Sequence, residues 1–103
     1  MPGVLDFKFM DCTAVRFSGH ALTRMFERGL SKDEVLNVIE HGVPITEYPD
    51  DHPYPSRLLL GWIEGRPIHV VVAKDWESRI CFVVTAYPPD PSIWSADFKT
   101  RRT

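Results

Sequence analysis

The strongest constraint on the fold of this 103-residue chain is a set of helix start and stop signals that begins at residue 18. Ser18 is a good N-cap, because its hydroxyl accepts a hydrogen bond from a free amide of the first helical turn. Gly29 is a good helix stop, because glycine adopts the left-handed conformation without steric cost. Apolar residues between them recur with helical spacing, which predicts a helix over about 19–28. Its polar face carries a cationic stripe spaced four residues apart, formed by His20, Arg24 and Arg28.

A second helix follows almost at once. Ser31 and Glu34 form a capping box, in which each side chain satisfies a backbone amide at the helix start. The apolar pattern then continues to about His41, and Gly42 ends the helix. Because the connection between the two helices is so short, the sequence predicts a helix hairpin.

The rest of the chain alternates between apolar stretches and turn signals, which is typical of strands. Glu64-Gly65 fits a two-residue hairpin turn, and its register places His69 near Leu60. We therefore predict an α+β fold, in which the helix hairpin packs on an antiparallel β-sheet of about four strands. The expected strands are Pro44–Tyr48, Arg57–Ile63, Pro67–Ala73 and Arg79–Tyr87. Strand-like alternation also occurs at Leu5, Phe7 and Phe9, and again at Ala14–Phe17.

The length predicts a single domain over residues 1–103. Within it we expect four parts: an N-terminal extension (1–15), the helix hairpin (16–42), the antiparallel sheet (43–87) and an extended basic tail (88–103).

Charge and cysteine content limit the classes of function. The formal net charge is −2, so no global basic field favours nucleic acid, and an anion site requires local clustering. Cys12 and Cys81 match no metal motif, and we expect two reduced thiols. There is no recognisable signal peptide and no apolar run long enough to span a membrane, so we expect a cytoplasmic protein.

Several motifs together resemble a bacterial family known as domain of unknown function 4258. The resemblance extends over roughly residues 16–102, and its first motif is Ser18-x-His20-Ala21-x-x-Arg24-Met25-x-x-Arg28-Gly29. It continues with Tyr48-Pro49-Asp50-Asp51-His52-Pro53-Tyr54-Pro55-Ser56, Leu60-Gly61 and Gly65-Arg66-Pro67-Ile68-His69-Val70-Val71. It closes with Val84-Thr85-Ala86-Tyr87, Pro89-Asp90-Pro91, Trp94, Asp97-Phe98 and Arg101-Arg102.

This family in turn resembles the RelE-type toxins in its two helices followed by an antiparallel sheet, so the resemblance implies a RelE-like fold. Those toxins are small ribonucleases that need no metal. The resemblance implies an RNA-cleaving toxin of a type II toxin–antitoxin pair, with a zinc-finger antitoxin as partner and no cofactor. RelE-type toxins usually carry a net basic surface, whereas this chain is slightly acidic.

Metal-independent RNA cleavage requires a base for the 2′-hydroxyl, a cation for the phosphorane and an acid for the leaving 5′-oxygen. Imidazole titrates near neutral pH, and guanidinium groups bind phosphate through paired donors. We therefore predict catalytic roles for His20, His69, Arg24 and Tyr87. We predict substrate-binding roles for Arg28, Arg66, Thr85, Arg101 and Arg102.

Each of these residues also has a structural interpretation. His69 in an apolar strand is equally typical of a core histidine satisfied by hydrogen bonds. The pattern does not decide whether His20 and His69 share a face, and His52 in its proline-rich loop stays unassigned. A metal site would need ligand spacing that the histidines lack, so we predict none. The main alternative to a ribonuclease is a non-catalytic module that binds protein or RNA, and the oligomeric state is left open.

Overall fold

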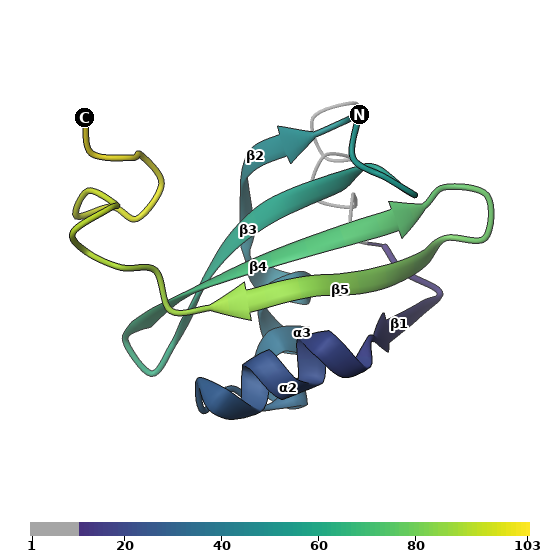
Figure 1. Cartoon of the computed structure of the whole chain (residues 1–103), viewed down its shortest axis with the longest axis horizontal. Coiled ribbons are helices and arrows are strands. Elements are labelled where there is room, and N and C mark those ends of the chain that lie inside the picture. The colour runs from purple at the N-terminus through teal and green to yellow at the C-terminus, as the bar shows by residue number, and fades with distance from the viewer. Residues whose placement is uncertain (1–10) are drawn as a thin grey trace.

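A five-stranded sheet with two helices forms the part of the chain that the computed structural model describes, residues 11–103. The elements are β1 (Ala14–Phe17), α2 (Gly19–Glu27), α3 (Lys32–His41), β2 (Val43–Tyr48), β3 (Ser56–Ile63), β4 (Arg66–Asp75) and β5 (Ile80–Tyr87). The strand order is β1-β5-β4-β3-β2. In Figure 1 both helices lie together beside the sheet. The yellow C-terminal segment, residues 88–103, continues past the end of β5. No helix within residues 11–103 is long and apolar enough to cross a membrane.

The predicted helix signals are confirmed. The Ser18 hydroxyl accepts from the Ala21 amide at 3.0 Å, and Gly29 adopts the left-handed conformation with φ of 70°. The capping box of α3 is also present. The Ser31 hydroxyl accepts from the Glu34 amide at 3.1 Å, and the Glu34 carboxylate accepts from the Ser31 amide at 2.9 Å.

The predicted helix hairpin is wrong. α2 packs on β5, whereas α3 packs on β3 and β4. An amphipathic helix has one apolar stripe to bury, and here the sheet covers both stripes. Ala21 and Met25 of α2, and Val35, Val38 and Ile39 of α3, join one core cluster with side chains of the sheet. The helices therefore lie as a layer on the sheet instead of packing mainly on each other.

The four predicted strands are confirmed, with small differences at their ends. The tight turn is also confirmed. Glu64 and Gly65 both have positive φ, at 51° and 79°, and Leu60 pairs with His69. The prediction of an antiparallel sheet of four strands is wrong, because β1 adds a fifth strand that runs parallel to β5. Local periodicity reveals a strand but not a partner that lies more than sixty residues away. The expected strand at residues 5–9 lies outside the described residues.

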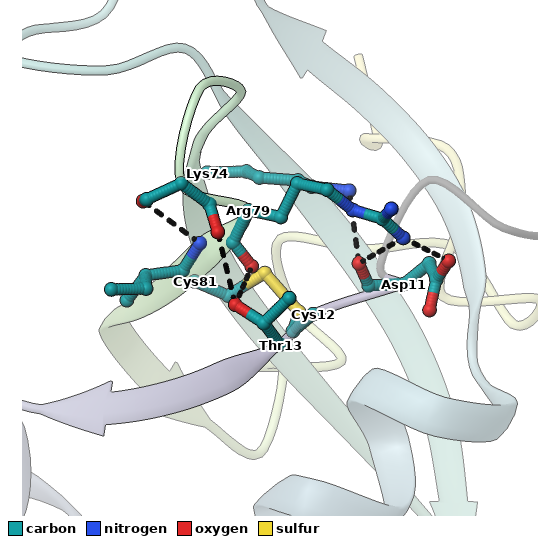
Figure 2. The surroundings of a disulfide bond; sticks show 8 residues. Asp11, Cys12, Thr13, Lys74, Arg79 and Cys81 are labelled. Carbon is teal, nitrogen blue, oxygen red and sulfur yellow. Dashed lines mark hydrogen bonds and ion pairs between the residues drawn. A yellow bond between two sulfur atoms is a disulfide. The ribbon is translucent and has the colours of Figure 1, made fainter.

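The cysteines also differ from expectation. A disulfide joins Cys12, just before β1, to Cys81 in β5 (Figure 2), so the prediction of two reduced thiols is wrong. The spacing of the two cysteines in the sequence does not indicate that they pair. The parallel pairing of β1 with β5 aligns Val15 with Cys81 and brings the preceding residues alongside the same strand.

Different parts of the chain pack on the two faces of the sheet. Ile68 and Val70 of β4 belong to the core beneath the helices. Since side chains alternate along a strand, His69 between them points to the opposite face. There it is covered by the C-terminal segment, whose Trp94 ring meets the His69 ring edge-on with centroids 4.6 Å apart. Within this segment Trp94 forms an isolated bridge with Arg101, so the segment folds back on itself.

Candidate functional site

The candidate site is built around His69 and Tyr87 on the sheet face away from the helices. The two residues are direct partners in the β4–β5 ladder. Cross-strand partners lie on the same face of a sheet, and the His69 Nδ1 and the Tyr87 hydroxyl are 3.3 Å apart. The second ring nitrogen, Nε2, lies 2.8 Å from the carbonyl oxygen of Phe98 in the C-terminal segment.

These contacts determine where the protons are. A backbone carbonyl only accepts hydrogen bonds, so the His69 Nε2 carries a hydrogen and donates it to Phe98. Nδ1 is then the acceptor, and the Tyr87 hydroxyl donates to it. His69 is fully buried, and this burial lowers its pKa while the bond to Phe98 acts in the opposite direction. The imidazole is therefore neutral at physiological pH.

The Tyr87 phenol is protonated as well. Burial raises its pKa, and the neighbouring Tyr48 phenol adds to the effect, whereas Arg101 and Arg28 lower it. With its proton directed at His69, the Tyr87 oxygen presents lone pairs to its other side. This geometry makes the pair a chain through which a proton can pass from solvent or substrate toward the imidazole.

Tyr87 also lines a hollow of about 540 Å³ between the sheet and the C-terminal segment. Its walls carry aromatic rings and two cations and are formed by Thr46, Tyr48, Leu58, Tyr87, Trp94, Lys99, Thr100 and Arg101. The Arg101 guanidinium carbon lies 5.3 Å from the centre of the Trp94 ring. Cations beside a protonated phenol suit an anionic ligand.

The Phe98 carbonyl owes its position to a turn around Asp97. The Asp97 carboxylate accepts from the Lys99 amide at 2.9 Å and from the Thr100 amide at 3.3 Å. Phe98 adopts a φ of 57°, which is unusual for a bulky residue. Because these bonds hold the turn, they orient both the carbonyl that meets His69 and the two cations of the hollow.

Arg28 and Thr85 come together at the open edge of β5. The pairing of β1 with β5 ends at Val83. Beyond that point the Arg28 guanidinium donates to the Ala86 carbonyl at 2.9 Å and to the Thr85 hydroxyl at 3.3 Å. Arg28 is close enough to lower the pKa of Tyr87, so it adds positive charge near the site. It also bonds the edge of β5 that β1 leaves unpaired.

The other predicted site residues lie elsewhere. His20 is exposed on α2, on the helix side of the sheet, so the structure does not bring it to His69. The guanidinium of Arg24 contacts Glu27 on the same helix at 3.4 Å, and Arg66 contacts Glu34 at 3.5 Å. The Arg102 Nε donates to the Pro91 carbonyl at 2.8 Å. The roles predicted for these four residues stay predictions.

Sequence reasoning missed Tyr48, Trp94, Phe98 and Lys99 as parts of the site. Their only signal was membership in the motifs and in the basic C-terminal stretch. Asp51, in the proline-rich loop, accepts from the Ser56 hydroxyl at 2.7 Å and holds that loop. Among residues 11–103 no three His, Cys, Asp or Glu side chains gather in a way that could hold a metal ion.

Comparison with known proteins gives one match. A family model described as "Domain of unknown function (DUF4258)" matches residues 17–88, more than half of the chain. The match includes His69, Tyr87, Arg28 and Thr85, and it ends before the C-terminal segment that closes the hollow. No curated protein and no solved structure matches the chain.

Proposed function

The chain belongs to this family of domains of unknown function, and from its site we propose that it is a metal-independent endoribonuclease of the RelE type. The observation that carries the proposal is the Tyr87–His69 pair at the wall of a hollow that also holds Lys99 and Arg101. A proton acceptor beside cations is what cleavage by 2′-hydroxyl attack requires.

The proposed base is Tyr87 backed by His69. As the 2′-oxygen attacks phosphorus, its proton passes to the Tyr87 oxygen, and the Tyr87 proton passes to the His69 Nδ1. The imidazole becomes a cation whose Nε2–H still donates to the Phe98 carbonyl. Because a neutral His69 is needed to accept the proton, its lowered pKa keeps this base ready at neutral pH.

Arg101 and Lys99 are the proposed partners of the phosphate. A guanidinium offers paired donors to two phosphate oxygens, and the interaction strengthens as the phosphorane gains charge. Lys99 lines the same hollow, and we assign its ammonium the transfer of a proton to the leaving 5′-oxygen. Arg28 contributes its charge from behind Tyr87.

The test uses purified chain and a single-stranded RNA oligonucleotide in the presence of a chelator. We expect cleavage that leaves a 2′,3′-cyclic phosphate and no cleavage of the same sequence made of 2′-deoxynucleotides. Arg101→Ala is expected to reduce the rate about 10- to 100-fold, the usual effect of losing a hydrogen bond to a charged group. Arg16→Ala, an exposed arginine on β1, is the matched control. Equal cleavage of the 2′-deoxy strand would contradict the mechanism.

We further propose that the partner is an acidic segment of a zinc-finger antitoxin that covers the hollow. Lys99, Arg101 and Arg102 are exposed on one folded segment, so complementary charge would accelerate association. Combined Arg101→Glu and Arg102→Glu changes are expected to slow association with a zinc-finger antitoxin encoded beside this chain about tenfold at low salt. Arg16→Glu should have little effect, and an unchanged association rate in the double variant would exclude this docking surface.

One observation favours the alternative, a non-catalytic binding module. Both ring nitrogens of His69 are bonded within the chain, and Trp94 packs against its ring, as expected of a histidine that only supports the fold. The chelated RNA assay separates the two functions, because a binding module retains RNA without cutting it. Since RNA is the substrate, we propose a cytoplasmic location.

A further inference from the structure

The Cys12–Cys81 disulfide joins a residue that precedes the family match to a strand within it. Cys81 lies in β5, within residues 17–88, whereas Cys12 lies before the range that the family model matches. Cys81 is fully buried, and Cys12 is partly exposed. Cys12 is therefore the more exposed half of the disulfide, and we expect an incoming thiol to attack its sulfur.

The other contacts of the segment formed by residues 11–13 are at the surface and are individually weak. The Thr13 amide donates to the Arg79 carbonyl at 2.8 Å, and the Thr13 hydroxyl donates to the Ser78 carbonyl at 3.0 Å. The Arg79 guanidinium forms an exposed ion pair with the Asp11 carboxylate. The covalent bond is thus the strongest link between residues 11–13 and the sheet.

The segment contacts a buried lysine. Lys74, directly opposite Cys81 in the β4–β5 ladder, is only 1% exposed. Its ammonium donates to the Asp11 carbonyl at 3.2 Å and lies 4.1 Å from the centre of the Trp76 ring. Figure 2 shows Lys74 and Arg79 both reaching toward Asp11 beside the disulfide. While the segment is in place, burial lowers the pKa of Lys74.

We propose that the Cys12–Cys81 disulfide is a reversible redox clamp, and that its reduction by a dithiol releases residues 11–13 and exposes Lys74. A dithiol thiolate attacks the Cys12 sulfur, the disulfide breaks, and Cys81 leaves as a thiolate that takes up a proton. The second dithiol sulfur then displaces Cys12 as a thiol. The dithiol ends as a cyclic disulfide, and two electrons have passed to the protein. The clamp is independent of the RNA chemistry proposed above.

The test follows acetylation of lysines by an amine-reactive ester, read by mass spectrometry, in the air-oxidised full chain with and without dithiothreitol. We expect the dithiol to raise the labelling rate of Lys74 at least about tenfold, as for other local openings. Exposed Lys99 is the internal reference and should not change. Reoxidation should restore slow labelling, and Cys12→Ser should label quickly with or without the dithiol.

Amide hydrogen exchange on the same samples shows whether the opening is local. Protection should fall in Thr13 and β1 and persist in α3 and β3. Three outcomes would overturn the clamp: two free thiols in the air-oxidised chain, a Lys74 rate that reduction does not change, or loss of protection throughout the reduced chain.

Discussion

Tyr87→Phe is expected to reduce RNA cleavage about 100-fold or more, the usual contribution of a positioned acid–base group. The variant keeps the aromatic ring and removes the oxygen that receives the 2′-hydroxyl proton. Its cost in stability should be only about 1 kcal/mol, because the lost hydrogen bond to His69 leaves one ring nitrogen without a donor. Single-turnover cleavage and thermal unfolding of the same preparation measure the two effects.

Tyr54→Phe is the matched control for this prediction. Tyr54 stacks on Phe82 with ring centroids 5.4 Å apart, outside the hollow. Its hydroxyl has no role in the proposed chemistry, so this variant should cleave and unfold like the wild type. If Tyr87→Phe also cleaves at the wild-type rate, the proton chain is not the base.

His69→Ala is expected to lower the free energy of unfolding by about 3 kcal/mol or more. The change leaves a void under Trp94 and removes the partners of both the Tyr87 hydroxyl and the Phe98 carbonyl. His69→Gln should recover part of the loss, because its amide group supplies both a donor and an acceptor. His20→Ala, at an exposed position, should remain within about 0.5 kcal/mol of wild type. Denaturant unfolding measures all three.

The same histidine predicts how stability depends on pH. Burial lowers the pKa of His69 below its ordinary value of 6.5, so below this pH the unfolded chain binds a proton that the folded chain does not. The contribution of His69 is therefore complete above pH 6.5 and is lost as the pH falls toward its folded pKa. The slope from this group reaches at most about 1.4 kcal/mol per pH unit. The His69→Gln variant should lack this pH dependence of the free energy of unfolding. An equal slope in both proteins would show that other titrating groups cause it.

Local signals predicted much of this fold. Caps, glycine stops and a two-residue turn act on neighbouring backbone groups, so the helices, four strands and the pairing of Leu60 with His69 could be inferred from the sequence. The same signals do not say what a helix packs against. The hairpin prediction failed because the apolar stripes of α2 and α3 both face the sheet. The parallel strand β1 and the disulfide depend on contacts distant in sequence, which local patterns do not encode.

The candidate site, like the fold, was predicted only in part from local sequence signals. The sequence by itself determined the residue types, with a histidine in an apolar strand, a tyrosine at a strand end and cations in the C-terminal stretch. The tertiary structure decided which of them meet. A bulge shifts the β4–β5 register between Val71 and Val72 and leaves Val84 as an extra residue in β5. If Val84 were instead paired with Val71, Tyr87 would oppose Ile68, on the helix side. One unpaired residue thus places Tyr87 beside His69, because a shift of one position turns every later side chain to the other face.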